Sequence, residues 1–371
     1  MNTFIKYKTK KNTFSTRSEF LDYCESHVGD KKDAEFNSAS FVYKNLPNYV
    51  TMDDYVEPVI AAQTWLKKLK NEEKPLVLLF SGGVDSIFAL NCMLDCGFPP
   101  KYILVYTLNP FDRSDIMCSH DMEPMYALQY LKERINNDLR LNKTKIWHVH
   151  LNQDYAEDFF SNKNWLKISG YSYSIETMGL WFELPKINEE TIKKYTFIKG
   201  GDFPRATVIE EKLNFFIVDL QLGERTDRQP IKCYDFVLDN KLMFNSLCVK
   251  YAEKINQEKN SIKNCYANYK NDGGSKYLLD EFSNLMSDCV PQLDKRFSEK
   301  LEPYNSDPKD IDELILRLHR NPLKTWLCYL QSEFFQPNWF QCYKKTVSEH
   351  YEWIEKRNRY LGKLSQFIEF K

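Results

Sequence analysis

Short apolar runs that alternate with helical patterns constrain the fold more than any other feature of this chain. Residues 75–80 (Pro-Leu-Val-Leu-Leu-Phe) form one such run, directly after a stretch rich in lysine and glutamate. A continuous apolar run of this length is typical of a parallel strand that is buried on both faces of its sheet. Similar runs follow at residues 102–107 and 146–151, with helical patterns between them. This alternation predicts an α/β fold built on a doubly wound, Rossmann-like parallel sheet.

Further elements are expected on either side of these three strands. Apolar residues at helical spacing predict helices at residues 59–70 and 124–139. A fourth strand is expected at residues 195–199, followed by a glycine pair. Beyond about residue 240 the pattern becomes mainly helical, and the tail at residues 353–370 predicts a packed amphipathic helix.

The change of pattern divides the chain into three parts. We expect an N-terminal extension at residues 1–74, an α/β domain at residues 75–240 and a mainly helical C-terminal region at residues 241–371. The chain contains only 12 glycines and 15 prolines, so long flexible linkers between these parts are not expected.

Composition and charge indicate the cellular location of the protein and the partners that it can attract. The formal net charge of −1 excludes a general attraction of the whole protein to nucleic acid, although it leaves a local basic patch open. The chain contains no apolar run long enough to span a bilayer and begins with a polar segment, so we expect no membrane association and a cytoplasmic location. Ten irregularly spaced cysteines then predict reduced thiols, most of them in the core.

The loop Ser81-Gly82-Gly83-Val84-Asp85-Ser86 lies between the first strand and the helix that follows it. The first turn of a helix offers backbone N–H groups and a partial positive charge. Two glycines allow the backbone to approach a phosphate closely, and two serines add hydroxyl donors. The carboxylate of Asp85 cannot bind an anion, so its expected role is to hold Mg²⁺ or to fix the loop. The loop is neither a Walker P-loop nor a dinucleotide fingerprint, because it lacks the lysine of the former and the third glycine of the latter.

This loop resembles the signature of the PP-loop ATP pyrophosphatases, also called adenine nucleotide alpha hydrolases. The resemblance implies that residues 81–86 grip the pyrophosphate that leaves ATP, with Asp85 and Ser86 taking part in catalysis. It also implies that adenine lies at the end of the second strand, near Tyr106 and Thr107. Members of this group cleave ATP between the α- and β-phosphates and form an adenylate, which ammonia, an amine or sulfur then attacks.

A second stretch, residues 322–345, is similar to the C-terminal end of 7-cyano-7-deazaguanine synthase, the queuosine-pathway member of the group. Thr325, Trp326, Cys328 and Tyr329 match its Thr-Trp-x-Cys-Tyr pattern, and Cys342 matches the last of four zinc-binding cysteines. The two middle ligand positions carry glutamine and tryptophan instead, and two thiolates do not complete a tetrahedral zinc site. We therefore expect Cys328 and Cys342 to be buried core residues more readily than metal ligands.

A third segment follows the fourth strand. Residues 200–205 (Gly-Gly-Asp-Phe-Pro-Arg) are similar to a glycine-to-aspartate loop that faces the active site in the same synthases. The resemblance implies that Asp202, Arg205 and the preceding Lys199 orient substrate or phosphate. An ordinary turn at the end of a strand explains the same residues equally well.

These resemblances imply an adenylating ligase that uses ATP and Mg²⁺ to activate a small carboxylate, similar to 7-carboxy-7-deazaguanine. Related synthase-like proteins in bacterial antiviral defence leave a second interpretation open, in which a protein or nucleic acid is modified. The same loop would also suit a tRNA-modifying or thiolating enzyme or, without catalysis, a degenerate nucleotide-binding subunit. The interpretation allows for a protein partner in a defence complex and for a homodimer.

Overall fold

The computed structural model describes about half of the chain, and all structural statements concern this part. The described residues are 5–8, 11–14, 23, 40–43, 46–70, 74–108, 119–151, 154, 193–201, 203–209, 212–216, 233–257, 341, 345, 348–349 and 367–371.

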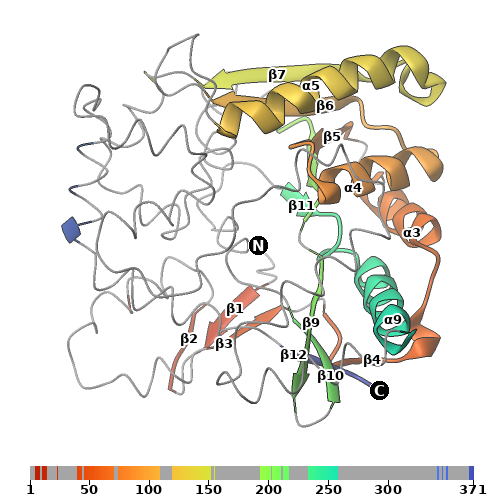
Figure 1. The fold of residues 1–371 in the computed structure, drawn as a ribbon, viewed down its shortest axis with the longest axis vertical. Coiled ribbons are helices and arrows are strands. Elements are labelled where there is room, and N and C mark those ends of the chain that lie inside the picture. Colours follow the sequence, from red (N-terminus) through yellow and green to blue (C-terminus); the bar gives the residue numbers. More distant parts are fainter. Residues whose placement is uncertain are drawn as a thin grey trace.

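A parallel sheet of five strands organises the described part of the chain (Figure 1). Its strands, in the order in which they lie side by side, are β11 (Cys233–Asp235), β8 (Thr196–Lys199), β5 (Leu76–Leu79), β6 (Tyr102–Leu108) and β7 (Lys145–Leu151). All neighbouring pairs are parallel, which confirms the predicted α/β fold with a parallel sheet. The chain runs outward from β5 through β6 to β7 and then returns to the other side of β5, where it forms β8 and β11. This order creates a topological switch point between β5 and β8.

Helices cover one face of this sheet. They are α3 (Pro58–Lys70), α4 (Val84–Asp95) and α5 (Ser119–Asn137). Trp65 of α3 packs edge-on against Tyr234 of β11, and Phe80, directly after β5, stacks on Tyr130 of α5. Tyr234 is in register with Ile198, and Ile198 is in register with Leu78, so these three side chains lie on the same face of the sheet. Phe80 follows Leu78 by two residues and therefore also points to this face. The predicted helices at residues 59–70 and 124–139 are therefore confirmed.

The last described helix, α9 (Lys241–Gln257), packs against α3. Its N-terminal cap is Asn240, whose Oδ1 accepts the N–H of Met243 at 3.2 Å and whose Nδ2 donates to the carbonyl of Ala61 in α3 at 3.1 Å. Phe244 and Leu247 of α9 belong to the same buried cluster as the strands of the sheet. Most of residues 258–366 lie outside the described part, so the mainly helical character of the C-terminal region stays a prediction.

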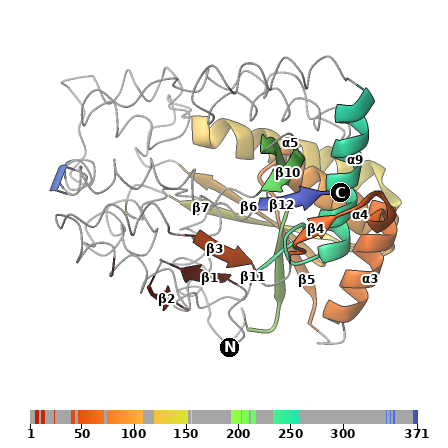
Figure 2. The same cartoon turned by 90° about the horizontal axis from the view of Figure 1, so that it is seen from below.

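A second sheet joins distant parts of the sequence (Figure 2). Its order is β4 (Tyr49–Val50), β12 (Phe367–Phe370), β10 (Lys212–Phe216) and β9 (Arg205–Ile209). The strands β9, β10 and β11 were not predicted from the sequence. The helix predicted at residues 353–370 is wrong for its last four residues, which form β12. Ile368 is fully buried opposite Phe215 of β10, so a tertiary partner decides the conformation of this short apolar segment.

Near the N-terminus, a small antiparallel sheet has the order β2 (Thr13–Phe14), β1 (Ile5–Lys8) and β3 (Ser40–Tyr43).

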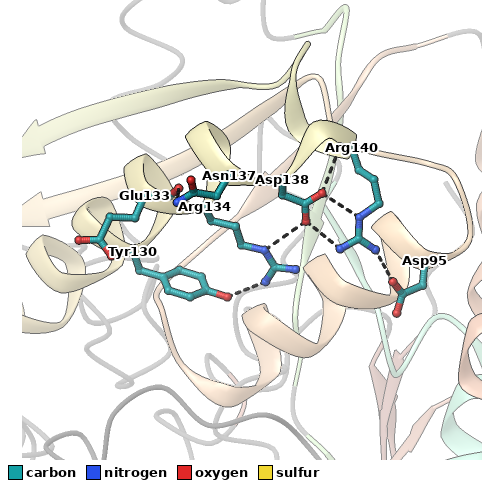
Figure 3. A network of polar contacts seen from close by, with 7 residues as sticks. All are labelled: Asp95, Tyr130, Glu133, Arg134, Asn137, Asp138 and Arg140. Atoms are coloured by element: carbon teal, nitrogen blue, oxygen red, sulfur yellow. Dashed lines mark hydrogen bonds and ion pairs between the residues drawn. The ribbon is translucent and has the colours of Figure 1, made fainter.

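A network of charged side chains ties the C-terminal ends of α4 and α5 together (Figure 3). Arg140, in the short helix η2 (Leu139–Leu141), contacts Asp95 at the end of α4 and Asp138 after α5, the latter at 2.7 Å. Arg134 of α5 contacts both Asp138 and the hydroxyl of Tyr130. Hydrogen bonds from Arg140, helped by the charge of Arg134, lower the pKa of Asp138 to about 2.

The network predicts a pH-dependent contribution to stability. A carboxylate with a lowered pKa stabilises the folded state above its unfolded pKa of about 4, and this contribution is lost as the pH falls through the folded value. Arg140→Gln is expected to lower the melting temperature at pH 7 by roughly 1–3 °C, and this difference is expected to shrink as the pH falls from 7 to about 3. Thermal melts of the variant and of Lys67→Gln, an exposed lysine of α3 without an ion pair among the described residues, would measure it. A difference that does not change with pH would contradict the role of Asp138.

Candidate functional site

The loop Ser81–Ser86 lies at the switch point of the sheet. It follows β5 at the carboxyl end of the strands, where ligands bind in open α/β sheets. The turn after the neighbouring strand β8 reaches the same place. A methyl group built on Gly200 would lie 2.6–2.7 Å from the backbone of Asp85 and Ser86. Only glycine allows this approach, so the first turn of α4 and the turn after β8 are in direct contact. The structure thus brings together two of the segments that sequence reasoning singled out.

The two glycines of the loop serve different purposes. Gly82 is buried and has a φ of 82°, a conformation that costs a residue with a side chain about 1–2 kcal/mol. Gly83 is exposed and forms the N-terminal cap of α4 with φ −72° and ψ 166°, which any residue can adopt. A methyl group on Gly83 would have Ser81 Oγ, at 3.4 Å, as its nearest neighbour, an ordinary contact. The fold therefore requires Gly82, whereas nothing in the described part requires Gly83.

The two serines also differ. Ser81 is exposed, and its Oγ accepts the N–H of Gly83 at 3.3 Å. Ser86 is only 4% exposed, and its hydroxyl donates to the carbonyl of Gly83 at 2.9 Å. The two Oγ atoms are 3.5 Å apart. Ser86 therefore closes the loop on its buried side, while Ser81 lies on its exposed side.

A glycine cap leaves the beginning of α4 open to a ligand. The N–H groups in the first turn of any α-helix cannot be satisfied within the helix, and a serine or aspartate cap would bind one of them. Gly83 has no side chain that could do so. Val84 and Asp85 begin the helix, and Asp85 is half-buried in the first turn, where the helix dipole favours a negative charge. The loop thus has one carboxylate beside the backbone N–H groups of the first helix turn.

Asp235, a buried carboxylate that was not predicted as a site residue, contacts the end of β8 beside this loop. Asp235, at the end of β11, is 1% exposed, and its Oδ1 accepts the N–H groups of Val237 at 3.1 Å and Leu238 at 2.8 Å. Its Oδ2 lies 3.8 Å from the ammonium of Lys199, the last residue of β8. Gly201, with φ 79°, passes so close that a methyl group on it would collide with the carboxylate. Asp235 therefore pairs with Lys199 and packs directly against the turn after β8.

The structure describes some of the remaining predicted site residues, and the others lie outside its described part. Tyr106 is buried near the carboxyl end of β6, and the backbone of Thr107 follows it in the same strand. The backbone of Arg205 begins β9 and pairs with Phe216 of β10. Asp202, Cys328 and Cys342 lie outside the described residues, as does the segment 109–118 that follows β6.

Metal-binding and thiol chemistry find little support in the described residues. No three His, Cys, Asp or Glu side chains gather there in a way that could hold a metal ion. Magnesium commonly binds through one or two carboxylates together with substrate phosphates, and Asp85 fits this mode.

The four described cysteines, Cys92, Cys96, Cys233 and Cys248, are free thiols. Burial raises the pKa of Cys92 to about 12 and that of Cys248 well above its usual value, so both stay protonated.

Comparison with protein-family models and with curated proteins found no match for this chain. Within the described residues, no helix combines the length and the apolar character needed to cross a membrane.

The support from Asp235 is open to test. Asp235→Ala would leave the buried N–H groups of Val237 and Leu238 without an acceptor and deprive Lys199 of its carboxylate. We expect a loss of about 2–3 kcal/mol in the free energy of unfolding, measured by urea denaturation. Asp235→Asn keeps an acceptor oxygen and should lose clearly less. Equal stability of the parent and both variants would contradict this role of the carboxylate.

Proposed function

We propose that the chain binds ATP at residues 81–86 and cleaves it between the α- and β-phosphates to activate a carboxylate. One observation carries the nucleotide-binding part: an exposed glycine caps α4 at the switch point of the sheet. Such a position offers backbone donors and a positive dipole to a phosphate group, and glycine permits its close approach. The choice of the α–β bond rests on the resemblance of the loop to that of the PP-loop ATP pyrophosphatases.

The proposed reaction has two steps. A carboxylate oxygen of the substrate attacks the α-phosphorus, the bond to the bridging β-oxygen breaks, and pyrophosphate leaves. Ammonia or an amine then attacks the carbonyl carbon of the acyl adenylate, loses a proton, and AMP departs. Activation is needed because a carboxylate oxygen is a poor leaving group and AMP is a good one.

The chain's residues would act mainly on the leaving pyrophosphate. The first turn of α4 and the exposed hydroxyl of Ser81 would stabilise the charge that grows on it. Asp85 would hold Mg²⁺, which neutralises phosphate charge when bound. Ser86 would keep the loop in shape through its bond to Gly83, so its role is positioning. Lys199, fixed by Asp235 at the end of β8, is the nearby cation that the structure describes on the adjoining strand.

For the carboxylate, we propose a small deazapurine-type acid with ammonia as nucleophile. This part rests on the resemblance of residues 322–345 and 200–205 to the deazaguanine synthases.

Turnover of ATP labelled in its α-phosphate tests the reaction directly. Labelled AMP should form only when a suitable acid is present, and pyrophosphate should appear in equal amount. Formation of labelled ADP would place the cleavage at another bond. Turnover that requires a protein or tRNA in place of a small acid would shift the proposal to a modifying enzyme, and binding without turnover would favour a nucleotide-binding subunit.

Two glycine variants at the two ends of α4 distinguish an effect on ATP binding from an effect on stability. Gly83→Ala should weaken ATP binding about tenfold or more, which corresponds to about 1.4 kcal/mol, because the methyl group projects where a phosphate would approach. Its melting temperature should change little, because the backbone of Gly83 suits any residue and the lower entropy of the unfolded alanine chain offsets the poorer helix cap. Gly97, after the other end of α4, has φ 79° and nothing within 4 Å of a built methyl group. Gly97→Ala should therefore lower the melting temperature and leave ATP binding intact. Calorimetric titration and thermal melts of both variants would measure this, and normal ATP binding by Gly83→Ala would remove the basis of the proposal.

A further inference from the structure

The amino edge of the parallel sheet carries a concentration of lysines. Because all neighbouring strands are parallel, their first residues lie at one edge of the sheet, opposite the edge that carries residues 81–86. The β7 arrow in Figure 1 points away from this amino edge. Four neighbouring strands begin there beside exposed lysines. We call these the amino-edge lysines: Lys74 before β5, Lys101 before β6, Lys143 and Lys145 at β7, and Lys194 before β8.

Backbone hydrogen bonds place these strand starts side by side. Lys101 donates its N–H to Leu76 at 2.9 Å, and Lys145 donates to the carbonyl of Lys101 at 3.0 Å. On the other side of β5, Thr196 donates to Pro75 at 3.0 Å. With neighbouring strands about 4.8 Å apart, the lysines from β8 to β7 cover about 14 Å.

The positive charge of this edge is not neutralised within the described part of the chain. None of the amino-edge lysines forms an ion pair there with a described carboxylate. Asp95 and Asp138 lie at the same edge, but both are engaged by Arg140, as Figure 3 shows. Among the described residues, this edge therefore carries more ammonium groups than carboxylates, although the chain as a whole has a net charge of −1.

Aromatic rings lie between these lysines. Tyr102, Trp147 and Tyr195 are half-buried and follow the lysines of β6, β7 and β8 directly or by two residues. They pack edge-to-face, with ring centroids 5.6 Å apart for Tyr102 and Tyr195 and 6.0 Å apart for Tyr102 and Trp147. The ammonium of Lys101 lies 5.7 Å from the ring of Tyr102. Partly exposed rings among cations provide both of the contacts that single-stranded nucleic acid needs.

We propose that the amino edge binds single-stranded nucleic acid, with the amino-edge lysines contacting phosphates and the rings of Tyr102, Trp147 and Tyr195 contacting bases. The proposal does not depend on the proposed ATP site, which lies at the opposite edge of the same sheet. These lysines lie at the edge of the sheet where α4 and α5 end, and cations near a helix C-terminus stabilise the helix dipole. That structural role would not produce binding to an oligonucleotide, so the two explanations lead to different results.

Fluorescence anisotropy with a labelled oligothymidylate of about 20 nucleotides tests this proposal without any nucleotide present. Between about 50 and 200 mM KCl, the logarithm of the affinity should fall with a slope of about −3.5 against the logarithm of salt concentration, since each of the lysines contributes about 0.7. The triple variant Lys101→Gln, Lys145→Gln, Lys194→Gln should bind at least tenfold more weakly and show a slope of about −1.4. The corresponding arginine variant should restore binding.

A matched control carries the same change in net charge elsewhere. Lys67, Lys68 and Lys241 are exposed on α3 and α9, and replacing all three by glutamine should leave binding unchanged. Gly83→Ala should also bind the oligonucleotide as the parent does, whatever happens to ATP. The proposal is overturned if the parent does not bind at about 50 mM KCl, or if the control variant loses as much affinity as the amino-edge variant. It is equally overturned if a duplex of the same length binds more tightly, or if polyglutamate competes as well as the oligonucleotide, which would indicate an acidic protein partner.

Discussion

The pairing of β5 with β6 on one side and β8 on the other is the interaction on which the rest of this structure depends. β5 has only four residues, and Val77 and Leu78 are completely buried. The chain forms β6 and β7 on one side of β5 before it returns to form β8 on the other side. The segments that follow β5 and β8 therefore begin next to each other at the carboxyl edge of the sheet. The close approach of Gly200 to the first turn of α4 is a direct consequence of this pairing. A buried carboxylate, Asp235, then pairs with Lys199 at the end of β8 and lies directly against Gly201 in the turn that follows.

The parallel arrangement gives the two edges of the sheet different chemistry. All strand ends meet at one edge, where the first turn of α4, Ser81 and Lys199 come together. All strand starts meet at the other edge, where a lysine lies at or just before the start of β5, β6, β7 and β8. A sheet of this kind can therefore present a nucleotide site and a separate surface for a polyanion without any contact between the two. An antiparallel sheet would have mixed strand starts and strand ends at both edges.

Much of the fold could be predicted from local patterns. The strands β5 to β8 and the helices α3 to α5 are found close to where apolar periodicity indicated them. The three-residue strand β11 was missed because a segment of this length carries no periodic pattern. The strand β12 was predicted as helix because its apolar residues suit either structure, and its pairing with β10 and β4 decided between them. The role of Asp235 had no sequence signal, since an isolated aspartate resembles any other turn residue.

The sequence by itself determined the parallel sheet and the loop at residues 81–86, because strand burial, glycine content and helix initiation are properties of neighbouring residues. Only the tertiary structure decided which strands lie beside β5, that Gly200 contacts the same helix turn, and that Ser86 faces inward while Ser81 faces outward. It also decided that lysines scattered between residues 74 and 194 share one edge. These features arise from contacts between residues far apart in the chain, and local propensity contains no information about such contacts.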